Sequence, residues 1–263
     1  MHFKDKVVLI TGGNSGIGKA TALAFAREGA IVVIVARDRN KLNQTINELK
    51  KHNNKCLSYV CDVRDAKKVS GVVKDAIRKF WKINILVNNA GFGIYRGFCE
   101  SSLDDIKEQM DVNYFGTVNF TKEVLPYMIK QRSGNIVNIA SAAGKAGFPG
   151  ASGYCASKFA VVGLSEALYY EMKKKGINVN LICPGAVDTP FQKNPGYEDF
   201  PHEKRHKKII KAEDVAKAVV DAVRFNRFET ILPFGVAVKL WGKGIVPFLW
   251  RKIVHTITRN EKY

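Results

Sequence analysis

Short apolar runs alternate with amphipathic segments along most of this 263-residue chain. The first run, KVVLIT at 6–11, is continuous in apolar and β-branched residues, which is typical of a strand buried on both faces in a parallel sheet. Similar runs lie at 31–36, 56–61, 85–87, 135–140 and 178–182, and helical patterns separate them at 19–28, 41–51, 66–81, 102–127 and 151–175. This alternation predicts an α/β fold with one doubly wound parallel sheet of about seven strands and helices on both faces.

A glycine-rich turn, GGNSGIG, follows the first strand and leads into a helix. Glycine lets the backbone turn tightly and approach a pyrophosphate without a Cβ in the way. The free N–H groups at the start of the helix favour a phosphate-bearing ligand. Strand, turn and helix in this order predict a Rossmann-type dinucleotide site. Its expected residues are Gly12, Asn14, Ser15, Gly16, Ile17 and Gly18.

The end of the second strand is where dinucleotide folds contact the adenosine ribose. A carboxylate at this point accepts hydrogen bonds from a ribose 2′-hydroxyl, but here Ala36 is followed by Arg37. The planar guanidinium can bind a 2′-phosphate, so Arg37 predicts a preference for NADP(H) over NAD(H). The alternative is that Arg37 is a solvated loop residue and that Asp38 only caps the next helix.

The stretch SAAGKAGFPGASGYCASK, residues 141–158, carries the candidate chemistry. Tyr154 and Lys158 are four residues apart and share one helix face, so the ammonium can lie beneath the phenol. A nearby cation favours the phenolate and is expected to lower the tyrosine pKa from about 10 into a range useful for proton transfer. Ser141 ends the fifth strand and can donate a hydrogen bond to the same substrate oxygen. Taken alone, the Tyr-x-x-x-Lys spacing also fits an exposed tyrosine beside a solvated lysine.

With these segments in place, the chain closely resembles the short-chain dehydrogenase/reductase family over about residues 5–232. The resemblance rests on the TGGNSGIG turn, the NNAG segment at 88–91, Asn113, Ser141, the Tyr154-x-x-x-Lys158 pair and the Pro-Gly pair at 184–185, which occur in the family's order and spacing. It implies that Asn113, Ser141, Tyr154 and Lys158 form a catalytic tetrad. Tyr154 would exchange the proton with the substrate oxygen, Ser141 would orient that oxygen, Lys158 would also bind the nicotinamide ribose, and Asn113 would hold a water in the proton relay.

The same resemblance implies direct hydride transfer between the nicotinamide and a carbonyl or alcohol carbon, without a metal. It places Asp62 and Val63 at the adenine, and Val187 and Thr189 at the carboxamide. The middle of the cofactor and the turn after the sixth strand would involve Asn88, Ala90, Gly91, Pro184 and Gly185. A mid-helix residue such as Asn113 is otherwise usually exposed, and the segment at 88–91 also fits a simple Asx turn.

The expected function is therefore NADP(H)-dependent reduction of a carbonyl compound. The alternatives are NAD-linked alcohol oxidation on the same scaffold and a non-catalytic dinucleotide-binding sensor. Specificity is expected in a lid-like segment at 186–212, with Phe191, Tyr197, Phe200 and His202, and in the loop at 92–98. These aromatic segments favour a hydrophobic, lipid-, steroid- or retinoid-like substrate, although aromatic residues that only close the core would look the same.

Composition and charge bear on the number of domains, the cellular compartment, the state of the cysteines and the binding partners. A single domain over 1–263 suits the length, and the N-terminus enters a strand pattern at once, so we expect a cytoplasmic protein without a signal peptide. Five scattered cysteines predict buried thiols rather than disulfides or a metal site. The net charge of +18 lacks any accompanying nucleic-acid motif, so no nucleic-acid partner is expected. By resemblance to relatives, the helices around 113–127 and 151–175 are expected to form a homodimer or homotetramer interface.

The C-terminal extension at 234–263 is basic and aromatic. Its uncharged runs are far shorter than the roughly 20 residues needed to span a bilayer. Ile245, Leu249, Ile253 and Ile257 would form one apolar stripe on a single helix. Such a stripe fits peripheral docking on an anionic membrane, and equally a pair of helices folded over the substrate cleft.

Overall fold

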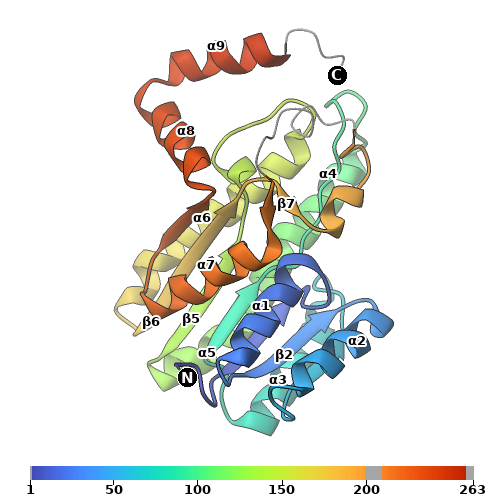
Figure 1. The fold of residues 1–263 in the computed structure, drawn as a ribbon, viewed down its shortest axis with the longest axis vertical. Coiled ribbons are helices and arrows are strands. Elements are labelled where there is room, and N and C mark those ends of the chain that lie inside the picture. Colours follow the sequence, from blue (N-terminus) through green and yellow to red (C-terminus); the bar gives the residue numbers. More distant parts are fainter. Residues whose placement is uncertain (1, 199–208, 259–263) are drawn as a thin grey trace.

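The computed structural model describes residues 2–198 and 209–258, apart from the side chains of 253, 255, 257 and 258. Seven parallel strands form one twisted sheet in the order β3-β2-β1-β4-β5-β6-β9 (Figure 1). The strands are β1 (Val7–Thr11), β2 (Ile31–Ala36), β3 (Leu57–Val60), β4 (Ile85–Asn88), β5 (Gly134–Ile139), β6 (Ile177–Pro184) and β9 (Glu229–Leu232). This confirms the predicted doubly wound α/β fold, and the strand order reverses between β1 and β4, where such sheets bind ligands.

Helices cover both faces of the sheet (Figure 1). On one face pack α1 (Gly16–Arg27), α2 (Arg39–Lys50) and α7 (Ala212–Arg224), and on the other pack α3 (Ala66–Phe80), α5 (Gly116–Gln131) and α6 (Ser152–Lys173). Successive residues of β1 point to opposite faces, so Val8 and Ile10 enter the first core while Val7 and Leu9 enter the second. The unbroken apolar runs therefore follow from burial on both faces.

The region from 102 to 131 is helical but not one uniform helix. Ser102 forms a capping box with Asp105 at the start of α4 (Leu103–Met110), as its position predicts. A π-helical turn, Asp111–Phe115, then separates α4 from α5 and carries Asn113. An extra residue in a helical turn re-aims the side chains on it, and π-turns are frequent at functional sites.

Shorter elements complete the chain beyond β6. A two-stranded ribbon of β7 (Val187–Asp188) and β8 (Ile210–Lys211) brackets a 3₁₀ turn at Pro190–Lys193. Another 3₁₀ turn, Ala142–Gly144, follows Ser141. Helices α8 (Phe234–Ile245) and α9 (Pro247–Thr258) follow β9 and project from one end of the sheet (Figure 1). Within the described residues, no helix is both long and apolar enough to cross a bilayer.

All five cysteines are free. Four of them are buried, but Cys99 is exposed, so the expectation that every thiol is buried is wrong at that position. Cys99 belongs to the turn that precedes α4, outside the strands and helices that form the core.

Candidate active site

A cavity of about 1200 Å³ lies at the carboxyl ends of the strands. It extends from the glycine turn and the end of β2, past Ser141, Tyr154 and Lys158, to α8 and α9. Most of the predicted cofactor residues line it: Gly12, Asn14, Ser15, Gly16, Ile17, Arg37, Asp62, Val63, Ala90, Gly91, Tyr154, Lys158, Pro184, Gly185, Val187 and Thr189. The cavity therefore gathers segments from almost the whole length of the chain at the position where a doubly wound sheet binds its ligand.

The glycine turn has the geometry of a phosphate cradle. Gly12 and Gly16 have φ values of +64° and +48°, a backbone region that residues with a Cβ rarely adopt. A Cβ on Gly12 would lie 2.8 Å from the side-chain amide nitrogen of Asn89, Nδ2. Gly18 does not line the cavity, because it packs against the carbonyl oxygen of Gly12, which a Cβ would strike. The turn thus fits a dinucleotide, with Gly18 supporting it from behind.

The structure places Asn89, and not the predicted Asn88, at the cavity. Asn88 is the last residue of β4 and is buried, where its amide donates to Thr121 (3.0 Å) and Asn138 (2.9 Å). Asn89 points the other way and donates to the carbonyl oxygen of Thr11 at 3.0 Å. Side chains alternate along a strand, so the neighbouring asparagine is the one that reaches the ligand side.

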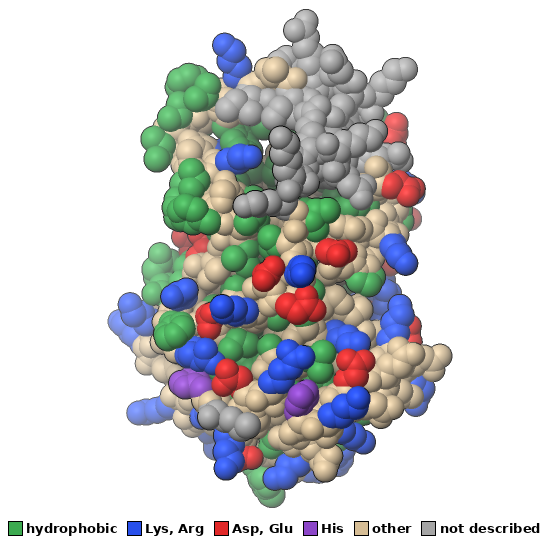
Figure 2. All heavy atoms as spheres, in the orientation of Figure 1, with side chains coloured by type: hydrophobic (Ala, Val, Ile, Leu, Met, Phe, Trp, Pro, Cys, Tyr) green, Lys and Arg blue, Asp and Glu red, His purple; other side chains and the backbone are tan. Residues whose placement is uncertain are grey.

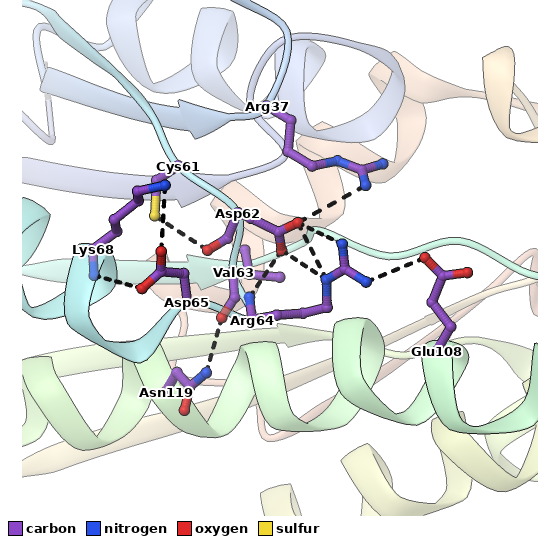
Figure 3. A network of polar contacts seen from close by, with 9 residues as sticks. All are labelled: Arg37, Cys61, Asp62, Val63, Arg64, Asp65, Lys68, Glu108 and Asn119. Carbon is purple, nitrogen blue, oxygen red and sulfur yellow. Dashed lines mark hydrogen bonds and ion pairs between the residues drawn. The ribbon is translucent and has the colours of Figure 1, made fainter. Parts of the chain in front are cut away.

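Charged residues surround the end of the cavity that follows β2 and β3 (Figure 3). Arg37 is 69% exposed and lies 4.0 Å from the carboxylate of Asp62. Arg64 also binds Asp62, and this contact is the largest cause that lowers the pKa of that carboxyl. Asp38 caps α2 by accepting a hydrogen bond from the Lys41 backbone at 3.0 Å, as the alternative interpretation of this loop expected. Capping by Asp38 leaves Arg37 free to face the cavity.

Ser141, Tyr154 and Lys158 meet at the middle of the cavity. Ser141 follows β5 and hydrogen-bonds the Tyr154 phenol. Lys158, on the next turn of α6, is only 4% exposed, and its Nζ donates to the Ile139 carbonyl at 3.1 Å and lies 5.8 Å from the Tyr154 ring centroid. The three side chains predicted to act together are therefore adjacent, and neither Tyr154 nor Lys158 is a solvated surface residue.

The direction of the Tyr154 pKa shift differs from the prediction. Burial raises the pKa of Tyr154 above its usual value, and the hydrogen bond with Ser141 opposes this only in part. Burial also lowers the pKa of Lys158 to about 8, because the charged ammonium loses its hydration. In the protein alone, desolvation of the phenol thus decides the direction of the Tyr154 pKa shift.

Asn113 is buried rather than exposed, with 1% of its surface accessible. Its side-chain oxygen accepts from the Phe92 N–H at 2.9 Å, and its amide donates to the Phe92 carbonyl (2.9 Å) and to Ser157 (2.8 Å). Asn113 does not line the cavity, but a Cβ on the cavity residue Gly91 would lie 2.9 Å from its oxygen. The side chain therefore fixes the loop after β4 against α6, and sequence reasoning missed this use of both amide groups.

The far end of the cavity is aromatic. Tyr95 packs against Tyr154 (ring centroids 5.7 Å apart) and Tyr197 (5.0 Å), and Phe191 packs 5.7 Å from Tyr154. Phe148 lines the same region. The structure thus brings parts of both expected specificity segments, 92–98 and 186–212, next to the candidate proton donor. Phe200 and His202, which belong to the expected lid, lie outside the described residues.

The C-terminal helices also line this end of the cavity, through residues such as Leu240, Val246 and Trp250. The helical conformation is interrupted at Val246, between α8 and α9, so the prediction that Ile245 and Leu249 belong to one helix is wrong. Pro247 supplies the physical reason, because proline starts a helix readily but cannot continue one. The side chains of Ile253 and Ile257, the rest of the expected stripe, lie outside the described set.

No three His, Cys, Asp or Glu side chains in the described ranges come together in a way that could hold a metal ion. The polar groups that do converge are a hydroxyl, a phenol and an amine beside a phosphate cradle. This set can orient an oxygen, transfer a proton and hold a dinucleotide.

Comparison with known proteins gives the same assignment. The family model for short chain dehydrogenase matches residues 6–198. The chain is 39% identical to the 3-oxoacyl-[acyl-carrier-protein] reductase FabG of Thermotoga maritima over 73% of this chain and 78% of that protein. It is 37% identical to the 3-dehydrosphinganine reductase of Danio rerio over 91% of this chain and 75% of that one. A short chain dehydrogenase/reductase from Burkholderia phymatum, solved in complex with NAD, superimposes with a TM-score of 0.87 at 28% identity and covers 95% of this chain and 96% of its own.

The family model spans most of the chain, and both relatives exceed a third in identity over more than two thirds of it. The chain therefore belongs to the short-chain dehydrogenase/reductase family and is an oxidoreductase that acts on carbonyl or alcohol groups with NAD(P).

Proposed function

We propose that this protein is an NADP(H)-dependent reductase of hydrophobic carbonyl compounds. The observation that carries the proposal is the course of the cavity, which runs from the phosphate cradle past Tyr154 into an aromatic and aliphatic compartment. Ligand sites of this kind combine apolar walls with a few convergent polar groups. The relative named as a 3-dehydrosphinganine reductase aligns over 91% of the chain, and its name supports the reductive direction.

The roles of the side chains follow from their positions. A bound nicotinamide supplies the hydride for the carbonyl carbon. Ser141 and Tyr154 hydrogen-bond the carbonyl oxygen, and Tyr154 gives its proton to that oxygen as negative charge develops. The buried Lys158 would stabilise the phenolate that remains and, by family resemblance, would hold the nicotinamide ribose. Asn113 holds the Phe92 loop in place and, by family resemblance, a water of the proton relay.

The preference for NADP(H) rests on Arg37. Its guanidinium is exposed at the end of β2, lines the cavity, and has as its ionic contact within ranges 2–198 and 209–258 the long one of 4.0 Å to Asp62. An Arg in this position can bind a 2′-phosphate bidentately, whereas the expected carboxylate of an NAD-specific fold is replaced by Ala36. The competing assignment is an NAD-linked alcohol dehydrogenase, and the solved relative that contains NAD gives it support.

The outer face of α8 supports peripheral docking on an anionic membrane. Phe234, Trp241 and Ile245 are 72%, 56% and 80% exposed, and Val238 lies between them on the same face. Figure 2 shows hydrophobic side chains gathered on the part of the molecule that α8 and α9 occupy. The lysines on these helices and the net charge of +18 favour binding of the protein to anionic lipid headgroups. A lipophilic substrate could then enter the cavity directly from the bilayer surface.

We also propose a homodimer, in which α5 and α6 of one copy contact the same helices of a second copy. Phe115 (at the start of α5) and Phe159 and Tyr170 on α6 are large apolar side chains that are exposed in the single chain. Large apolar side chains exposed on the same pair of helices are typical of surfaces that a partner covers.

Replacement of Tyr154 by phenylalanine tests the proposed chemistry. The change removes only the hydroxyl, so turnover of NADPH with a panel of hydrophobic ketones should fall by on the order of 10² or more. NADPH binding, measured by fluorescence titration, should persist. A folded Tyr154→Phe protein with near-normal turnover would refute the role of Tyr154, and an unaltered protein that reduces no ketone on the panel but oxidises alcohols with NAD would favour the competing assignment.

A further inference from the structure

Four charged side chains of alternating sign form a chain beside the proposed 2′-phosphate position (Figure 3). Arg37, after β2, contacts Asp62, after β3. Asp62 in turn contacts Arg64, which reaches Glu108 on α4 at 3.2 Å. Arg37 and Asp62 line the cavity, whereas Arg64 does not. Arg64 therefore acts on the cavity only through Asp62.

The two arginines share one carboxylate very unequally. Arg64 donates from Nη2 to Oδ2 of Asp62 at 2.7 Å and from Nε to Oδ1 and Oδ2 at 3.1 and 3.2 Å. Arg37 lies 4.0 Å from the same Oδ2, too far for a hydrogen bond. The fork of Arg64 thus satisfies the carboxylate, and within the described part of the chain Arg37 is left without a close ionic partner.

The loop that carries Asp62 and Arg64 is held from both sides. The Arg64 backbone N–H donates to Asp62 Oδ1 at 3.0 Å, and Asp65 caps α3 through the Lys68 N–H at 3.0 Å. Asn119 on α5 donates to the carbonyl of the intervening Val63 at 2.9 Å. The orientation of Arg64 towards Asp62 is consequently a property of the folded loop, visible in Figure 3.

We propose that Arg64 is a positioning residue for cofactor specificity: it neutralises Asp62 and so leaves Arg37 available for the 2′-phosphate of NADP(H). This inference rests on the NADP(H) preference proposed above. Without Arg64, the carboxylate of Asp62 would have Arg37 as its remaining cationic partner among the residues that the structure describes. It would draw Arg37 away from a phosphate and would itself repel the phosphate. NADH carries no 2′-phosphate, so its binding should be little affected.

The test is fluorescence titration of NADPH and NADH with four proteins at the same low ionic strength. The proteins are the unaltered chain, Arg64→Gln, the double variant Asp62→Asn/Arg64→Gln, and Arg78→Gln as control. Arg78 pairs with Asp75 on α3 and does not line the cavity, so its loss removes one positive charge without touching the site. Arg64→Gln should raise the Kd for NADPH about tenfold and that for NADH less than about twofold.

The double variant separates neutralisation of Asp62 from a merely structural role. Asparagine carries no charge to compensate, so the NADPH-to-NADH affinity ratio should return to within about threefold of the original. Equal losses for both cofactors in Arg64→Gln, or a ratio that the double variant fails to restore, would overturn the inference. Equal affinity of the unaltered protein for NADPH and NADH would overturn the NADP(H) preference and the inference together, whereas an NADPH-to-NADH affinity ratio that Arg64→Gln leaves unchanged overturns the inference alone.

Discussion

Lys158 gives the sharpest quantitative prediction, because its buried amine has no carboxylate partner among the described residues. Its amine donates a hydrogen bond to the Ile139 carbonyl, and burial lowers its pKa from 10.5 to about 8. Methionine has a similar length and shape but no charge. We therefore expect Lys158→Met to abolish most of the turnover and at the same time to stabilise the fold near neutral pH.

The size of the expected stability change follows from the pKa of Lys158 in the unfolded chain, 10.5, and in the folded chain, about 8. The difference of 2.5 units (10.5 minus about 8), at 1.36 kcal/mol each, is a cost of about 3 kcal/mol for burying the ammonium. Below pH 8 the amine is protonated in both the folded and the unfolded chain, so the whole cost is present. Between about pH 8 and 10.5 the folded chain releases the proton while the unfolded chain keeps it, and the stability of the unaltered protein rises with pH.

Urea unfolding of both proteins at pH 7 to 10, at equal protein concentration, measures this difference. At pH 7 the free energy of unfolding of Lys158→Met should exceed that of the unaltered protein by about 1 to 3 kcal/mol, since loss of the hydrogen bond to Ile139 offsets part of the gain. The two curves should converge as pH approaches 10. Lys74→Met, on the exposed side of α3, serves as a control whose effect should not depend on pH. A Lys158→Met protein that is less stable by the same amount at every pH would refute the reasoning.

Three further predictions concern the cofactor, the membrane and the assembly. Arg37→Ala should weaken NADPH binding by about 1.5 to 3 kcal/mol and leave NADH nearly unchanged in fluorescence titrations, and equal losses would assign Arg37 a general structural role. The full-length protein should co-sediment with anionic but not neutral vesicles at low salt, and Trp241→Ser/Ile245→Ser should reduce this binding; a protein that stays in the supernatant contradicts membrane docking. Light scattering at micromolar concentration should give the mass of a dimer or tetramer, and Phe159→Ser should weaken this association. A monomeric unaltered protein would contradict the proposed interface.

The sheet was predictable because two-sided burial leaves an unambiguous record in the sequence. Strands β1 and β2 are buried at every position and apolar apart from Thr11 at the end of β1, and only a strand covered by helices on both faces tolerates this pattern. The glycine turn was predictable for a similar reason, since positive φ at Gly12 and Gly16 restricts the residue type. In both cases the constraint acts on the residue itself and needs no knowledge of distant partners.

Predictions failed where the outcome depended on which of two neighbours faces the ligand, or on a sum of opposing energies. Asn88 and Asn89 are chemically identical, and their roles were decided by which one falls on the core side of β4. The Tyr154 pKa depends on burial by Tyr95 and Phe191, which come from segments far from it in the sequence. The i, i+4 spacing of Tyr154 and Lys158 predicts that the two side chains are neighbours, but it does not show the desolvation that raises the Tyr154 pKa.

The C-terminal extension shows why one sequence pattern supported two interpretations. Helix α8 is apolar on two neighbouring sides: Ala237 and Leu240 are buried, while Trp241 and Ile245 are exposed. Lys243 holds this arrangement by donating to the Lys145 carbonyl at 2.6 Å, so the inner side is fixed to the core. A helix that only closed a cleft would need one apolar side, and its outer side would normally be polar. The covering of the cavity therefore accounts for the buried apolar side chains of α8 but not for the exposed ones, which are the part that membrane docking would bury.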